Sequence, residues 1–200
     1  MLGHEEEKGI MFLTVEELFS KISSYSSDRD YKIKLWYLEI YNENIKDLLN
    51  PNDENCDLRE DPQKGTIVSN ISELNVSTSN DIMNLVRQGN KNRTQEATNA
   101  NETSSRSHAI LQILVEYKEK VTGIDAEIKI GKLSLIDLAG SERAKDTLNK
   151  GIRLLEGANI NRSLLTLGNC INALCEANEK GTKPYVPYRD SKLTRLLKVN

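Results

Sequence analysis

The chain has 200 residues and a formal net charge of −3, with 38% hydrophobic and 28% charged residues. This length and composition predict one domain with a sizeable buried core. No apolar run is long enough to cross a bilayer, and the acidic start around Glu5, Glu6 and Glu7 lacks the form of a secretory signal. Three cysteines without metal-ligand spacing are typical of reduced thiols, so we expect a cytoplasmic protein with no membrane span.

Charge is unevenly spread along the chain. Residues 1–60 carry 7 Lys or Arg against 14 Asp or Glu, whereas residues 141–200 carry 11 against 6. The basic part is suited to an acidic partner, although a solvated surface of uneven charge explains the same pattern. The negative net charge and an aromatic content of 5% argue against nucleic acid as that partner. His4 and His108 are too few and too far apart to predict a metal or catalytic cluster.

The first regular pattern predicts a helix. Thr14 and Glu17 have the spacing of a capping box, and Leu13 with Leu18 forms a candidate hydrophobic staple. The apolar residues that follow lie on one helical face, so we expect a helix from Val15 to about residue 22.

Residues 31–41 are rich in aromatic and β-branched side chains, and apolar residues occupy both alternating positions. This pattern predicts a strand buried on both faces, or a strand with a bulge near Leu35. Residues 42–49 then predict a short helix ended by Asn50-Pro51. Two short strands are expected in the turn-rich stretch beyond, around Leu58 and Ile67.

A second helix is expected after residue 78. Thr78 and Asp81 are suited to cap it, and its apolar residues have helical spacing. Residues 88–101 lack a hydrophobic period and predict an exposed loop with some helical character. The apolar residues of the helix are Ile82, Leu85 and Val86.

Residues 109–118 alternate between apolar and polar side chains and predict a strand. Residues 127–137 predict its antiparallel partner, across a loop around Gly123. This pairing would bring residues 104–106 and 137–142 to the same edge of one sheet. It is the step that joins two distant motifs into one candidate site.

The last part of the chain predicts a long helix after a polar loop that ends near Gly157. Its apolar spacing alternates between four and three residues, which favours a helix packed on the core over a coiled coil. Residues 179–181 end this helix, and residues 191–198 begin another. The apolar seam consists of Ile160, Leu164, Leu167, Ile171 and Leu174.

The best-defined motif is the apolar run that ends at Asp137 and is followed by Gly140. A carboxylate at the end of a strand suits Mg²⁺, directly or through water, and a glycine beyond it lets backbone N–H groups approach a phosphate. The pattern is therefore suited to the Mg²⁺ side of a nucleoside-triphosphate site. An ordinary Asp/Gly turn at a strand end has the same four-residue form.

Two longer strings are more specific. Residues 137–142, Asp-Leu-Ala-Gly-Ser-Glu, resemble the second switch of kinesin motor domains, and residues 101–108, Asn-Glu-Thr-Ser-Ser-Arg-Ser-His, resemble the first. The resemblance extends over nearly the whole chain. It implies an α/β fold of the P-loop NTPase-like kinesin motor type, with a mixed central sheet flanked by helices. It also implies a microtubule-based motor that couples ATP binding and hydrolysis to microtubule binding and movement.

The resemblance implies a role for the polar residues of both strings. Arg106 and Glu142 would form an ion pair that links the two loops, although as an isolated surface pair it would be worth only roughly 0–1 kcal/mol. Ser105 and Asp137 would hold Mg²⁺, partly through water. The residues implied to bind ATP are Asn101, Ser104, Ser105, Asp137 and Gly140, and those implied to act in hydrolysis are Ser104, Ser105, Arg106, Asp137, Gly140 and Glu142.

Other strings resemble the microtubule-facing part of kinesins, at residues 158–164 and 188–197. Residues 92–95 and 167–174 resemble the kinesin-eight group in particular. The resemblance therefore implies microtubules as the partner and the cytoskeleton as the location. The implied contact residues are Lys150, Arg153, Arg162, Arg189, Lys192 and Arg195.

The chain departs from the family in one respect, because it contains no Gly-x-x-x-x-Gly-Lys-Ser/Thr sequence for a phosphate-binding loop. It begins with Met1-Leu2-Gly3, which resembles the segment that follows this loop in kinesins, and it stops before the family's last strand, last helix and neck linker. We therefore expect residues 1–200 to be a partial motor domain, incomplete at both ends, with any dimer formed through segments absent here. The alternative is a non-hydrolysing remnant that binds microtubules or another partner.

Overall fold

The computed structural model describes residues 1, 3, 7–51, 56–62, 65–95, 106–120, 127–140, 152–181 and 183–198. The helices are α1 (Ile10–Ser24), α2 (Ser79–Gln95), α3 (Ile152–Lys180) and α4 (Lys192–Leu197), with a short 3₁₀ helix at Tyr188–Asp190. The strands are β1 (Arg29–Tyr41), β2 (Asn44–Asp47), β3 (Asp57–Asp61), β4 (Gly65–Ser69), β5 (Leu74–Val76), β6 (His108–Glu119) and β7 (Lys129–Asp137). Within this described part, no helix is both long and apolar enough to span a membrane.

The main sheet has the strand order β2-β1-β6-β7, with β5 also paired to β1, and β3 and β4 form a separate ribbon. β1 and β6 pair without interruption from Arg29 opposite Glu119 to Ile40 opposite His108, so β1 has no bulge. All strand pairs in the described residues are antiparallel, whereas the resemblance predicts a mixed sheet. The pairs β1–β2 and β6–β7 join consecutive strands, and such short connections favour antiparallel neighbours.

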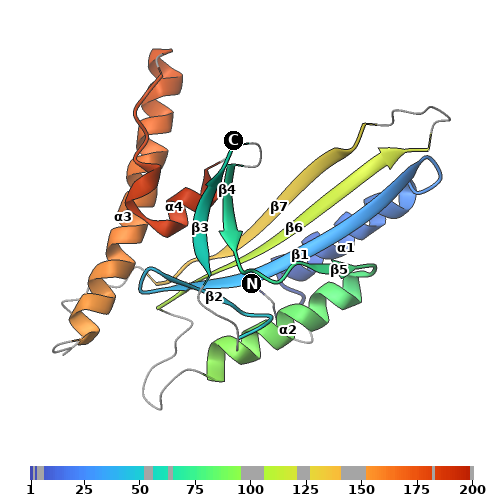
Figure 1. Ribbon diagram of the computed structural model, residues 1–200, viewed down its shortest axis with the longest axis horizontal. Coiled ribbons are helices and arrows are strands. Elements are labelled where there is room, and N and C mark those ends of the chain that lie inside the picture. Colours follow the sequence, from blue (N-terminus) through green and yellow to red (C-terminus); the bar gives the residue numbers. More distant parts are fainter. Residues whose placement is uncertain are drawn as a thin grey trace.

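Helices cover both faces of the sheet and make three layers (Figure 1). On one face, Val15 of α1 and Val86 of α2 pack in a core with Leu35 of β1. On the other face, Leu193 of α4 packs in a second core with Leu38. Because successive strand residues point to opposite faces, β1 needs apolar residues at both alternating positions. The prediction of a strand buried on both faces is therefore confirmed.

Helix α1 begins earlier than the predicted capping box. Gly9 is the N-cap residue, and Thr14 lies inside the helix, where its Oγ1 donates to the carbonyl oxygen of Ile10 at 2.7 Å. The predicted start at Val15 is therefore wrong. Met11 explains the longer helix, because it is buried one turn before Val15 and extends the apolar face toward the sheet.

Residues 42–49 form a hairpin and strand β2 instead of the predicted short helix. Asn42 and Glu43 have left-handed backbone conformations, with φ of 50° and 58°, as a two-residue type I′ hairpin turn requires. Ile45 is buried and pairs with Ile40 of β1. The apolar spacing of this stretch also fits a helix. Pairing with β1 instead gives its backbone N–H and C=O groups hydrogen-bond partners in a strand.

Helix α2 has the predicted cap. The backbone N–H of Asp81 donates to Thr78 Oγ1 at 3.1 Å, and the N–H of Thr78 donates to Asp81 Oδ2 at 2.9 Å. The helix continues to Gln95, so the helical character expected within residues 88–101 is confirmed, and the expected exposed loop is wrong as far as Gln95. Gly89 and Arg93 explain the longer helix, because both are buried and continue the face of the helix that packs on the sheet.

Helix α3 begins at Ile152 rather than after Gly157, and it ends at Lys180 before Gly181, as predicted. Gly181 has φ of 63°, the left-handed conformation that commonly follows a helix end.

The predicted apolar seam of α3 is only partly buried. Ile171 and Leu174 are 51% and 46% exposed, whereas Ser163, Thr166 and Cys170 are buried. The buried face of α3 is therefore rotated from the predicted one. The reason is that this face of α3 packs against α4 and against the polar side chain of His108 in β6. Small and polar residues such as Ser163 fit that contact.

Candidate functional site

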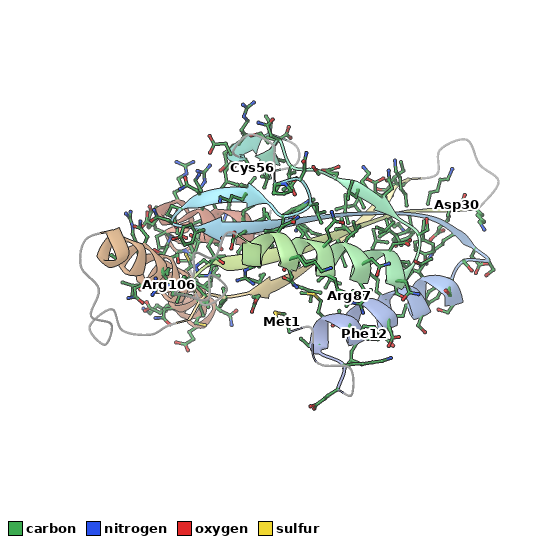
Figure 2. All side chains as sticks on the ribbon, turned by 90° about the horizontal axis from the view of Figure 1, so that it is seen from below. Met1, Phe12, Asp30, Cys56, Arg87 and Arg106 are labelled. Carbon is green, nitrogen blue, oxygen red and sulfur yellow. The ribbon has the colours of Figure 1, made fainter. Side chains whose placement is uncertain are left out.

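The candidate site lies where β6 begins and β7 ends. Ala109 pairs with Asp137 and His108 pairs with Ile40, so the start of β6 and the ends of β1 and β7 share one end of the sheet. Figure 2 shows Arg106 at this end, beside α3, and Asp30 at the opposite tip of the molecule. The prediction that antiparallel pairing brings residues 104–106 and 137–142 to the same edge is confirmed for residues 106 and 137–140, and the other residues of the two segments lie outside the described part.

Arg93 of α2 organises this end through a buried guanidinium group. Its Nη1 donates to Asp137 Oδ2 at 2.9 Å, and its Nη2 donates to the carbonyl oxygen of Ser107 at 2.7 Å. Its Nε donates to Ser107 Oγ at 3.2 Å and lies 3.5 Å from Glu39 Oε1. The planar fork of an arginine can hold several acceptors at once, so Arg93 joins α2, β1 and both strings of the site.

This ionic cluster is mostly desolvated. Arg93 is 5% exposed and Glu39 is 2% exposed, whereas the Asp137 side chain is 43% exposed. Buried charges need partners, since removal of one partner from a buried pair costs roughly 3–5 kcal/mol. The pair of Arg93 with Glu39 therefore holds the cluster in place, while Asp137 keeps access to solvent and to a ligand.

His108 lies beside this cluster and is 3% exposed. Its Nδ1 accepts from the backbone N–H of Ala139 at 3.0 Å, and its Nε2 lies 2.7 Å from Ser163 Oγ. Burial, and to a smaller extent the positive charge of Arg93, lowers the pKa of His108 to about 4. The imidazole is therefore neutral at physiological pH.

The last turns of α2 are held against β1. Gly89 lies where an added Cβ would overlap the ring of Tyr37, whose hydroxyl donates to Asn90 Oδ1 at 2.8 Å. Asn92 Nδ2 donates to the carbonyl oxygen of Leu48 at 2.7 Å. Burial raises the pKa of Tyr37 to about 12, so its hydroxyl remains a donor. These contacts fix the position from which Arg93 reaches the sheet end.

Comparison with known proteins identifies the family. The family model of the kinesin motor domain matches residues 1–200. The chain belongs to the kinesin motor domain family.

Two curated relatives illustrate the similarity. KIF19 of Xenopus laevis is 55% identical over 199 residues, which are 99% of this chain and 20% of that protein. KIN-8A of Arabidopsis thaliana is 50% identical over 198 residues, which are 99% of this chain and 26% of that protein. The predicted leaning toward the kinesin-eight group is confirmed, and the chain spans between a fifth and about a quarter of the length of these relatives.

A solved structure supports the fold. The chain resembles a KIF14 dimer with AMP-PNP in complex with a microtubule, with a TM-score of 0.85 and 37% sequence identity. The match covers 98% of this chain and 56% of that chain. The expected kinesin motor fold is confirmed.

Several predicted site residues of this kinesin chain lie outside the described residues. Arg106 is described and partly buried, but its predicted partner Glu142 is not, so the ion pair between the two loops stays a prediction. Asp137 and Gly140 are described and lie at the same sheet end. The other residues outside the described part are Asn101, Ser104, Ser105 and Lys150, together with the side chain of Arg153.

The predicted microtubule contacts divide into two groups. Arg162 on α3 and Arg189 in the 3₁₀ helix are exposed. Lys192 and Arg195 on α4 are only about a quarter exposed, and they form ion pairs with acidic residues of β3. The pairs are Lys192 Nζ with Asp57 Oδ1 at 3.4 Å and Arg195 Nη2 with Glu60 Oε1 at 3.5 Å. Lys192 and Arg195 therefore also join α4 to the β3–β4 ribbon.

Sequence reasoning did not identify Arg93, Glu39 and His108 as members of the site. The sequence contains a pattern that could have identified Arg93, because this residue lies at helical spacing from Ile82 and Val86 and therefore on the buried face of α2. A charged residue on such a face needs a buried partner, and this requirement points to a functional or ionic cluster. No comparable sequence signal identifies Glu39 as that partner.

Proposed function

We propose that this kinesin chain is the part of an ATP-driven microtubule motor that carries its two nucleotide-sensing loops and part of its microtubule surface. The observation that supports this most directly is the register of β6 with β7, in which Ala109 lies opposite Asp137. Loops of this kind become ordered around a γ-phosphate and relax after hydrolysis, which provides a two-state element. The motor would act on the microtubule cytoskeleton in the cytoplasm.

Asp137 is the described residue through which the chain would hold Mg²⁺ with ATP. Its Oδ2 is bonded to Arg93, and its Oδ1 has no hydrogen bond from the described residues. No group of three or more His, Cys, Asp or Glu side chains in the described part is placed to hold a metal. Mg²⁺ typically uses one or two carboxylates with substrate phosphates and several waters, so a single half-exposed carboxylate fits it. The ion would offset phosphate charge when bound.

The remaining roles follow the two switch strings. Ser104, Ser105 and Gly140 would position the γ-phosphate and the attacking water, with Asn101 also at the nucleotide. Arg106 and Glu142 would close the site as an ion pair. Phosphoryl transfer requires mostly positioning and charge stabilisation, so such small groups are sufficient for it.

Hydrolysis would require a phosphate-binding loop, and the chain contains no Gly-x-x-x-x-Gly-Lys-Ser/Thr sequence. We therefore propose that residues 1–200 alone do not turn over ATP. Loss of one donor to a developing charge already costs on the order of 3 kcal/mol of transition-state stabilisation. The alternative function is a part of a kinesin that binds microtubules without hydrolysis.

ATP calorimetry, microtubule binding and microtubule-stimulated phosphate release together separate the two candidates. Residues 1–200 are compared with a motor domain completed by the P-loop portion of KIF19. Microtubule-stimulated phosphate release by the completed protein, and none by residues 1–200, supports the motor. Microtubule binding without turnover by both proteins supports the remnant. Micromolar ATP affinity and turnover by residues 1–200 alone would contradict the proposal that the loop is required.

The microtubule surface is proposed on α3 and α4, on the face of the sheet opposite α1 and α2. Tubulin is acidic, so binding by exposed arginines would weaken as salt increases. In the completed motor, Arg162→Glu with Arg189→Glu is expected to reduce co-sedimentation with microtubules at low salt. Matched reversals at Lys21 on α1 and Arg87 on α2, which are also exposed, are expected to leave it unchanged. Equal effects of both pairs would contradict this surface.

A further inference from the structure

His108 connects two segments that are far apart in the chain. Its Nδ1 accepts from the backbone N–H of Ala139, in the segment of residues 138–140 that follows β7, at 3.0 Å. Its Nε2 lies 2.7 Å from Ser163 Oγ on helix α3. The ring is 3% exposed and Ser163 is 2% exposed, so water does not compete effectively for either bond.

The geometry defines the direction of each bond. A backbone N–H only donates, so Nδ1 of His108 must be unprotonated, and the neutral ring carries its proton on Nε2. Nε2 therefore donates to Ser163 Oγ, and that hydroxyl donates to the carbonyl oxygen of Ile160 at 2.8 Å. A continuous series of donors thus runs from the backbone of Ala139 to the backbone of α3.

A second bond holds α3 at the same sheet end without touching the segment of residues 138–140. Asn159 Nδ2 donates to Asn42 Oδ1, in the hairpin turn after β1. Asn159 and Ser163 are four residues apart and lie on the same side of α3. The hairpin bond therefore provides an internal comparison for the bond through His108.

We propose that His108 is a positioning residue that couples residues 138–140 to helix α3, so that a displacement of one requires a displacement of the other. The coupling rests on the proposed function for its role in the motor, because residues 138–140 belong to the second switch string and α3 lies on the proposed microtubule surface. Its physical basis is separate from that function. Either segment can move alone only by breaking a buried hydrogen bond to one imidazole.

Hydrogen exchange on residues 1–200 tests the coupling directly. Ser163→Ala removes the partner of Nε2 and does not touch Ala139. We expect the exchange rate of the Ala139 amide to rise by about 5- to 10-fold, as the loss of one supporting hydrogen bond implies. Asn159→Ala is the matched control on the same face of α3, and we expect it to leave that rate unchanged. An unchanged rate in Ser163→Ala, or an equal rise in both variants, overturns the proposal.

Two further measurements distinguish coupling from simple destabilisation. Nitrogen NMR of the unaltered chain should show His108 protonated on Nε2 and unprotonated on Nδ1, and the opposite tautomer overturns the assignment. His108→Asn keeps an acceptor near the position of Nδ1 but loses Nε2, so adding Ser163→Ala to it should produce no further rise in Ala139 exchange. Additive rises would contradict a single connection. These results do not depend on ATP or microtubules, so failure of the proposed function would leave them interpretable.

Discussion

Replacement of Arg93 by Met tests the buried ionic cluster. The change removes the positive charge that lies beside Glu39, a carboxylate that is 2% exposed. Breaking a buried pair in this way costs roughly 3–5 kcal/mol. The loss of Asp137 as a partner adds little, because that side chain is 43% exposed and water replaces the bond. We expect a loss of about 4 kcal/mol, a large share of the roughly 5–15 kcal/mol typical of a domain.

Urea unfolding of residues 1–200 at pH 7 measures this loss. With a slope of about 2 kcal/mol per molar urea, the midpoint should fall by about 2 M. Arg87→Met is the matched control, since Arg87 lies exposed on the same helix, and its effect should stay within about 0.5 kcal/mol. Combining Arg93→Met with Glu39→Gln removes both charges and should recover most of the lost stability.

Two results would contradict the expected loss of stability. One is a midpoint for Arg93→Met that is no lower than that of Arg87→Met. The other is a double variant in which the two single losses simply add, because additivity would show that Arg93 and Glu39 do not interact.

Other predictions concern neighbouring parts of the site. Between pH 6.5 and 4, the unaltered chain should lose about 2.5 kcal/mol more unfolding free energy than His108→Asn, as urea titrations at both pH values can check. The reason is that the folded-state pKa of about 4 lies below the ordinary value of 6.5, so the unfolded state takes up the proton first. Gly89→Ala should destabilise the chain by about 1–3 kcal/mol in thermal unfolding, since overlap with the Tyr37 ring outweighs the better helix propensity. Arg195→Glu should lower stability more than Arg189→Glu in the same assay, because Arg195 is partly buried beside Glu60. In the completed motor, Arg106→Ala and Glu142→Ala should reduce stimulated hydrolysis non-additively when combined, whereas strictly additive losses would show that the pair is not coupled.

Features that depend on neighbouring residues could be predicted from the sequence alone. The alternation of residues 109–118 predicted β6, and the Thr78–Asp81 spacing predicted the cap of α2. The two switch strings and the family they indicate also came from contiguous residues. These predictions succeed because strand alternation and helix capping are set within a few residues along the chain.

Local patterns misled where two structures fit the same spacing. Residues 42–49 have helical apolar spacing, yet pairing with β1 made them a hairpin and strand. Thr14 has the form of a cap, yet burial of Met11 started the helix earlier. In both cases a contact with a distant part of the chain outweighed a small local preference.

The polar residues of the site could be identified only from the way the elements pack in space. Arg93, Glu39 and Asp137 come from α2, β1 and β7, and nothing in their local sequences pairs them. His108 likewise meets Ala139 and Ser163 only after α3 packs on the sheet. The physical reason is that a buried charge or imidazole is stable only with partners at hydrogen-bond distance, and those distances are set by strand register and helix packing.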